Sequence, residues 1–240
     1  MTIRLYLVRH GETPMNAARQ LQGITDAALT AKGRAAADRL GELLRPVPFA
    51  KVFTSDRGRT IETAHRIIAG HRPQPPLIQL SALREYYFGG LEGDSGNAVI
   101  TRTIRQFGVA AAFRAWRGSE RFAGLVRSIR EADPTHQAED LPDLIARAHQ
   151  AFTQVIAQSP DNSDILVVSH GMLLSALIYQ LAPEDLPFML LKNTSVTRVD
   201  ITEKQWQVRG VNLTRERDIL ALRGSATSTA PDAASDQSPK

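Results

Sequence analysis

Two short apolar runs, far apart in the chain, each lead directly into the dipeptide His-Gly. The first run covers residues 3–8 and leads to His10, and the second covers residues 164–169 and leads to His170. Both runs are rich in strand-forming residues and are followed by a turn-forming glycine, so they predict buried β-strands. Any fold of this chain must therefore place two imidazoles just beyond the ends of two strands.

Strand-like and helix-like segments alternate along the rest of the chain. Further strands are expected at residues 52–54, 196–202 and 206–213, and helices are expected after Thr30, after Ser55 and Asp56, near Asp140 and over residues 173–181. Such alternation is typical of an α/β fold, here a three-layer sandwich with a mostly parallel central sheet and helices on both faces. Ligands of such sheets bind beyond the carboxyl ends of the strands, where both His-Gly pairs are expected.

Residues 94–135 depart from this alternation, and we interpret them as a helical lid insertion. The arginines of the segment are Arg102, Arg105, Arg114, Arg117, Arg121, Arg127 and Arg130. The aromatic residues Phe113, Trp116 and Phe122 are interleaved among them. The arginines are expected either to line solvated helix faces or to contact a ligand.

The chain is expected to form a single domain over residues 1–223. With 240 residues, of which 42% are hydrophobic, it is long enough to bury one substantial core. Residues 224–240 are mostly Ser, Ala, Thr, Pro and Asp, so this tail is expected to be disordered.

Composition argues against several classes of protein. The chain has no cysteine, which excludes disulfides and thiolate metal sites and fits a reducing cytoplasm. It has neither an apolar run long enough to span a membrane nor a signal-like start, so we expect a soluble cytoplasmic protein without a membrane partner. Its basic residues, with a net charge of +4, are spread along the chain, so no nucleic-acid partner is expected.

Four stretches carry residue types that suit a phosphate site. They are Arg9-His10-Gly11, Arg59, Arg84-Glu85 and His170-Gly171. Guanidinium groups match phosphate oxygens in bidentate geometry and keep their charge, and a nearby carboxyl group supplies an acid. The motifs G-x-x-x-x-G-K-[ST], G-x-G-x-x-G, G-x-S-x-G and H-E-x-x-H are all absent from the sequence. The residues therefore indicate phosphoryl chemistry without a nucleotide motif.

The same stretches belong to longer motifs that resemble a known family. The motifs are RHGETPMN (9–16), LQGITDAALTAKG (21–33), TSDRGRTIETA (54–64), LREYYFGGLEG (83–93), VVSHG (167–171) and NTSVT (193–197). In them the chain is similar to the histidine phosphatase superfamily, the group that also contains the cofactor-dependent phosphoglycerate mutases. The resemblance covers about residues 1–215.

The resemblance implies a role for each matching residue. It implies that His10 is the nucleophile that forms a phosphohistidine and that Glu85 is the proton donor. It also implies that the phosphoryl group is bound by Arg9, Arg59, His170, Asn16 and Gly171. The residues that it implies bind the rest of the substrate are Gln22, Gly23 and Tyr87. A neutral imidazole is a good nucleophile near neutral pH, and flanking arginines favour that form. Glu85 must begin protonated, so we expect burial against its aromatic neighbours to hold its proton. No metal or cofactor is expected, because the arginines supply the positive charge.

Several alternatives stay open at this point. The stretch around Leu21 has the form of the phosphatase branch, so the sequence favours a phosphomonoesterase for small phosphorylated metabolites over a phosphoglycerate mutase. Leu91 and residues 138–140 depart from the family pattern, which affects the substrate pocket. A binding module without turnover and a zinc-dependent hydrolase are further alternatives, although Arg9 and Arg59 would repel a cation. If the lid selects leaving groups, it would favour small phosphorylated sugars or acids. The apolar face of the lid and the edge of the 196–213 hairpin are compatible with a homodimer.

Overall fold

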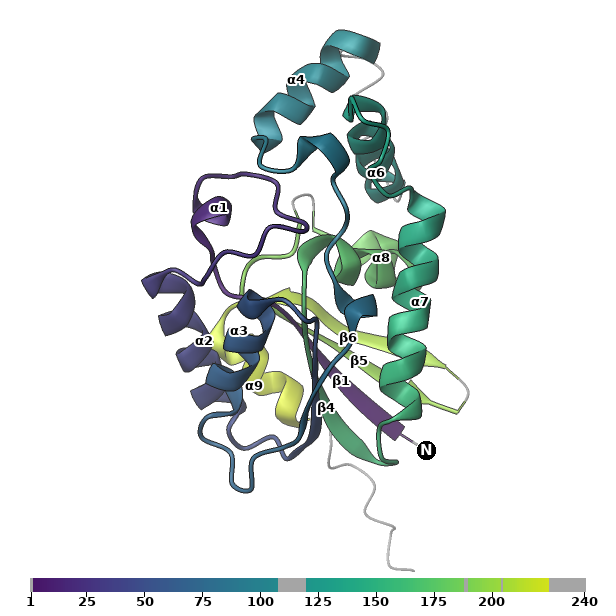
Figure 1. The fold of residues 1–240 in the computed structure, drawn as a ribbon. Coiled ribbons are helices and arrows are strands. Elements are labelled where there is room, and N and C mark those ends of the chain that lie inside the picture. Colours follow the sequence, from purple (N-terminus) through teal and green to yellow (C-terminus); the bar gives the residue numbers. More distant parts are fainter. Residues whose placement is uncertain (1, 108–119, 188–189, 204, 225–240) are drawn as a thin grey trace, which may run out of the picture.

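A single mixed sheet forms the centre of the computed structural model, which describes residues 2–107, 120–187, 190–203 and 205–224 (Figure 1). Its strands are β1 (Thr2–Arg9), β2 (Phe49–Thr54), β3 (Leu77–Gln79), β4 (Ser163–Ser169), β5 (Val196–Thr202) and β6 (Trp206–Leu213). Their order is β3-β2-β4-β1-β5-β6, in which the first four are parallel and β5 and β6 are antiparallel to their neighbours. The prediction of a mostly parallel sheet with a hairpin at one edge is confirmed.

Helices cover both faces of this sheet. They are α1 (Pro14–Ala17), α2 (Ala31–Leu44), α3 (Gly58–Ile68), α4 (Gly96–Phe107), α6 (Arg121–Ala132), α7 (Leu141–Ala157), α8 (Gly171–Leu181) and α9 (Glu216–Gly224), with short 3₁₀ turns at Ser81–Leu83, Gly89–Leu91 and Pro183–Asp185. Figure 1 shows α2, α3 and α9 on one side of the sheet and α7 and α8 on the other. None of the helices in the described ranges combines the length and apolar character needed to cross a membrane.

Alternation of side chains along the central strands creates the two cores. Leu5 and Leu7 of β1 pack with α7 and α8, whereas Tyr6 and Val8 pack with α2, α3 and α9. Each fully buried aliphatic side chain contributes roughly 1.5–3 kcal/mol, so both faces hold the strands in this register. The helix α8 is buried nearly all round, as its continuous apolar sequence predicts.

Helix starts agree with the sequence in two cases and differ in one. Thr30 caps α2 by accepting from the Gly33 amide at 2.9 Å, and Asp140 caps α7. The expected cap of α3 by Ser55 and Asp56 is wrong. Arg57 occupies that position without a side-chain cap, and the Asp26 carboxylate from a distant loop accepts from the first amides of α3. A cap supplied through tertiary structure leaves no local sequence signal.

Three elements were not expected from the sequence, and the lid differs in detail. The strand β3 has three residues next to a proline-rich stretch, α1 is a single turn, and α9 follows the edge hairpin and contacts α2. The expected lid is present as α4 and α6, which pack together beyond the carboxyl ends of the strands (Figure 1). Residues 108–119 and the tail 225–240, with the predictions made for them, lie outside the described residues.

Candidate active site

The two His-Gly pairs meet because β1 and β4 are neighbouring parallel strands. Arg9 lies opposite Ser169 in the register, and the His10 amide donates to the Ser169 carbonyl at 3.0 Å. The rings of His10 and His170 are both buried, and their centroids are 5.2 Å apart at 63°. The sheet thus brings two imidazoles to one point at the carboxyl ends of its central strands.

The orientation of His10 determines which ring nitrogen can react. Its Nδ1 lies 2.8 Å from the Gly11 carbonyl oxygen, and a carbonyl only accepts, so Nδ1 carries the hydrogen. The neutral ring therefore has its lone pair on Nε2. The Gly11 amide donates to Thr63 Oγ1 of α3 at 2.9 Å, and a β-carbon at Gly11 would lie 2.9 Å from the Gly33 carbonyl oxygen. Glycine is required here by close backbone approach, as the motif suggests.

His170 is held by the hydroxyl group of Ser55, which the sequence indicated only as a helix cap. Its Nε2 lies 2.8 Å from Ser55 Oγ, and its Nδ1 is buried with no hydrogen-bond partner among the described residues. When Nδ1 carries the hydrogen, the Ser55 hydroxyl donates to Nε2, and Nδ1 can donate to a phosphoryl oxygen. Burial lowers the pKa of His170 well below 6.5, and the charge of Arg59 lowers it further.

Arg9 and Arg59 bring two buried guanidinium groups to the imidazoles. Arg9 donates to the Leu191 carbonyl and packs against Gly171, where a β-carbon would lie 3.4 Å from the guanidinium. Arg59 is fully buried and donates to the carbonyls of Gly23 at 2.9 Å and Thr25 at 2.7 Å. Within the described part of the chain, Nε of both arginines is buried and lacks a hydrogen-bond partner. Burial lowers the pKa of both groups, and the charge of Glu85 opposes this shift.

The carboxylate of Glu85 lies at the start of α8, where backbone amides donate to it. Its Oε1 accepts from the amides of Tyr86 (2.8 Å), Met172 (3.0 Å) and Leu173 (3.3 Å), whereas Oε2 accepts only from Met172 at 3.3 Å. The carboxylate thus serves as an external cap of the helix, through amide donors that the sequence did not indicate. Oε1 accepts from three amides and Oε2 from one.

This arrangement of residues agrees with a comparison against protein families. A model of the histidine phosphatase superfamily, branch 1, matches residues 5–214. The chain belongs to the histidine phosphatase superfamily. The match confirms the prediction, made from the motifs, of an enzyme of this superfamily.

Individual relatives support the same membership and carry different activities in their names. The chain is 33% identical over 227 residues to a protein of Erwinia tasmaniensis named probable phosphoglycerate mutase GpmB, covering 93% of this chain and 97% of that protein. It is similar to the solved phosphoglycerate mutase from Bacillus anthracis, with a TM-score of 0.82 and 29% identity over 92% and 96% of the two chains. It is also similar to a putative alpha-ribazole-5'-P phosphatase from Escherichia coli, with a TM-score of 0.66 and 28% identity over 88% and 96%.

A network of polar side chains in this superfamily member holds Asn16 beside the histidine. Asn193 Nδ2 donates to the His10 carbonyl at 2.9 Å and to Asn16 Oδ1 at 3.0 Å. Because Oδ1 of Asn16 is held in this way, its side-chain nitrogen Nδ2 can donate to a ligand. Thr13 caps the single turn α1 and donates to Gln22 Oε1 at 2.7 Å. Gln22 Nε2 is buried and has no partner among the residues that the structure describes. Asn193 belongs to the NTSVT motif, which was the available sequence signal for it.

The two remaining residues expected to bind substrate lie in different surroundings. Gly23 is part of the site through its backbone: its amide donates to Glu92, and its carbonyl accepts from Arg59. A β-carbon at Gly23 would lie 2.4 Å from the Tyr86 carbonyl oxygen, so a side chain is excluded. Tyr87 donates its hydroxyl to Gln137 at 3.1 Å, whereas its neighbour Phe88 lines the cavity beside the site.

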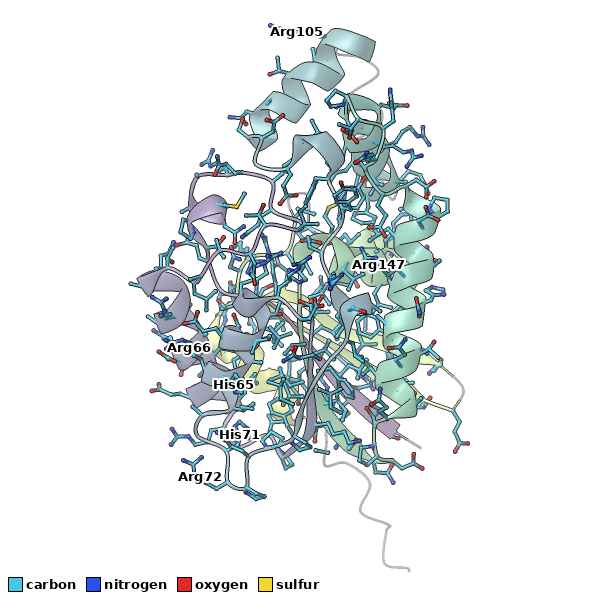
Figure 2. All side chains as sticks on the ribbon, viewed as in Figure 1. His65, Arg66, His71, Arg72, Arg105 and Arg147 are labelled. Atoms are coloured by element: carbon cyan, nitrogen blue, oxygen red, sulfur yellow. The ribbon has the colours of Figure 1, made fainter. Side chains whose placement is uncertain are left out.

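Arg147 of α7 fixes the backbone on both sides of Glu85, and the sequence did not reveal it. Its guanidinium donates to the carbonyls of Ala82, Arg84 and Glu85, and it also forms an ion pair with Glu139 at 2.7 Å. Figure 2 shows Arg147 extending from α7 toward the middle of the molecule. Arg147 is therefore a positioning residue for the loop that carries Glu85.

A cavity of about 610 Å³ adjoins the phosphate site, and we call it the lid cavity. It is lined by Arg9, Asn16, Arg19, Gln20, Leu21, Phe88, Gly96, Asn97, Arg121, Phe122, Leu125, Ser128, Ile129, Met172, Ser175, Leu186, Pro187, Leu190 and Asn193. Of the described lid arginines, Arg121 reaches this cavity, and Arg130 donates to the Ala138 carbonyl. Arg127 is exposed, and so is Arg105, which lies at the outer end of α4 (Figure 2). Arg114, Arg117 and the side chain of Arg102 lie outside the described residues. In the described ranges no group of three or more His, Cys, Asp or Glu residues is placed to hold a metal ion.

We expect the His10 imidazole to remain neutral when the pH falls through 6.5. Burial lowers the pKa of His10 well below 6.5, and the charges of Arg9 and Arg59 lower it further. A ¹³C NMR titration of the histidine rings in phosphate-free buffer should show that His10 keeps its neutral-form shift when the pH falls below 6.5. Arg9→Met should raise the midpoint by removing one charge. A wild-type midpoint at or above 6.5 would contradict the expected direction.

Proposed function

We propose that this histidine phosphatase hydrolyses phosphomonoesters of small metabolites through a phosphohistidine at His10, without a metal or cofactor. One observation carries the proposal. The His10 ring lies 5.2 Å from that of His170 and close enough to Arg9 and Arg59 for their charges to lower its pKa, and each of these three partners has a buried N–H group that lacks a partner in the described part of the chain. A phosphoryl group placed there would satisfy these donors while its phosphorus faces the nucleophile.

In the first step, His10 Nε2 attacks phosphorus and the bond from phosphorus to the ester oxygen breaks. The two guanidinium groups and His170 stabilise the charge on the phosphoryl oxygens. A proton on Glu85 Oε2 passes to the leaving oxygen, and Oε1 keeps its bonds to the amides of Tyr86 and Met172 throughout. The helix start then stabilises the carboxylate that this transfer produces.

In the second step, water attacks the phosphohistidine and the bond from phosphorus to nitrogen breaks. Glu85 takes the proton of the attacking water and so returns to its starting form, and His10 is released as a neutral ring. Phosphate leaves as the second product. The same carboxyl group thus acts first as acid and then as base.

The alternative is mutase chemistry, which the names of several relatives suggest. A phosphoglycerate mutase must hold a second phosphate of its substrate while the first is transferred. A phosphate dianion needs several positive groups, whereas the walls of the lid cavity are mainly apolar, and this favours hydrolysis. A binding module without turnover is disfavoured because the nucleophile, the acid and both arginines are all present.

In the test, purified protein is incubated in the presence of a chelator with one of two substrates. One is 4-nitrophenyl phosphate, and the other is 3-phosphoglycerate together with its bisphosphorylated primer. We expect release of phosphate that depends on His10 and continues with chelator, because arginines supply the positive charge. Formation of 2-phosphoglycerate should be slower than release of phosphate. Isomer formation that outpaces release would show a mutase, and loss of activity with chelator would show a metal-dependent enzyme.

The proposal extends to the setting of the enzyme. Residues 1–223 would form one catalytic domain with the lid at 94–135, as expected from the sequence. The absence of cysteine supports a cytoplasmic location. A small phosphorylated substrate is the expected partner, and a homodimer remains a prediction.

A further inference from the structure

The lid cavity begins at the phosphate site and extends under the lid, so it is where the rest of a substrate would lie. Arg9, Asn16 and Asn193 line its inner end, next to His10. On the lid side, α6 contributes Phe122 and further residues along one face. A group attached to the phosphoryl oxygen would therefore be enclosed between α6 and α8.

The walls of the lid cavity are mainly apolar. Phe122, Leu125 and Ile129 have the spacing of one helix face on α6, and they line the cavity together with Phe88 and Met172. A polyol such as a sugar would lose its hydrogen bonds to water there and find few replacements. An aromatic or aliphatic body would be stabilised by the area that it buries.

Besides Arg9 at the phosphate site, two buried polar groups in the described walls have no protein partner. Ser175 of α8 is 1% exposed, and its Oγ has no hydrogen-bond partner among the described residues. Arg121 Nε on α6 is likewise buried, and no described residue accepts from it. A hydroxyl and a guanidinium both donate, so together they suit an acceptor that carries negative charge, such as a carboxylate.

We infer that the substrates are phosphomonoesters of apolar hydroxy acids: the leaving group has an apolar body, and its carboxylate binds Arg121 and Ser175. This inference rests on the proposed function, because it assumes that His10 receives the phosphoryl group. It keeps the acids of the sequence-based expectation, but it replaces the sugars with an apolar body. The difference arises because the cavity walls come from segments that are far apart in the sequence.

The test compares three alkyl phosphates, whose leaving alcohols have similar acidity. We would measure kcat/KM for (6-carboxy-2-naphthyl)methyl phosphate, 2-naphthylmethyl phosphate and glycerol 2-phosphate, and we call the first two the naphthyl esters. Both naphthyl esters should exceed glycerol 2-phosphate by at least about 100-fold, from the apolar area buried. The carboxylate should add about tenfold or more, because a buried charge-assisted hydrogen bond contributes this much.

Three variants assign these gains to residues. Arg121→Met should abolish the advantage of the carboxylate and leave kcat/KM for 2-naphthylmethyl phosphate unchanged. Leu125→Asn, at a half-buried position, should lower kcat/KM for both naphthyl esters and leave glycerol 2-phosphate unchanged. Arg127→Met, on the exposed face of the same helix, is the matched control and should change none of the three.

The outcomes separate this inference from the proposed function. Hydrolysis of glycerol 2-phosphate that depends on His10, with no preference for naphthyl esters, would overturn the inference and leave the proposed function standing. A carboxylate advantage that survives Arg121→Met would overturn the assignment to Arg121. No His10-dependent hydrolysis of any probe would overturn both.

Discussion

Replacing His10 with alanine is expected to lower kcat for phosphomonoester hydrolysis by a factor on the order of 10⁴, because the nucleophile of the covalent step is removed. Reactions with ³²P-labelled substrate, quenched with alkaline detergent because phosphohistidine is labile in acid, should show labelled protein for the wild type and none for His10→Ala. Arg9, Arg59 and His170 remain in the variant. Inorganic phosphate or vanadate should therefore still bind, with an affinity that calorimetry can compare with that of the wild type.

The matched control for this substitution is His65→Ala. His65 lies on the exposed face of α3, away from the cavity (Figure 2). We expect full activity and normal labelling in this variant. If His10→Ala keeps more than a few per cent of the activity, or if it still becomes labelled, another side chain must accept the phosphoryl group.

The positions of the two histidines could be predicted because they follow from local rules. Buried strands are visible as apolar runs, glycine marks their ends, and parallel strands of one sheet end at the same edge. The register places Arg9 opposite Ser169, so the proximity of His10 and His170 follows from strand pairing alone. No knowledge of side-chain packing is needed for this part of the site.

The partners of these residues could not be predicted in the same way. Ser55 reaches His170, and Arg147 reaches the Glu85 loop, through packing between segments that are remote in the sequence. Asp26 caps α3 for the same reason. The environment of Glu85 was predicted from its aromatic neighbours in the sequence, but it is determined by the start of α8, where Met172 and Leu173 present their amides.

The environment of Glu85 leads to a second expectation, which depends on the leaving group. Glu85→Gln keeps an oxygen that can accept from the amide of Met172 but removes the transferable proton. Alkyl phosphates need that proton, so their kcat/KM should fall by about 10²–10⁴. For 4-nitrophenyl phosphate the leaving oxygen needs no proton, and kcat/KM, which reports the steps up to phosphorylation, should fall much less.

A comparison of two substitutions separates catalysis from helix capping. Glu85→Ala removes the acceptor for the amides at the start of α8, so it should lower the free energy of unfolding by about 1 kcal/mol. Glu85→Gln should leave the free energy of unfolding nearly unchanged, as chemical denaturation can measure. The control Glu42→Gln, at an exposed site on α2, should alter neither property. Equal losses for alkyl and 4-nitrophenyl esters in Glu85→Gln would mean that Glu85 acts only by holding α8 in place, and that another group protonates the leaving oxygen.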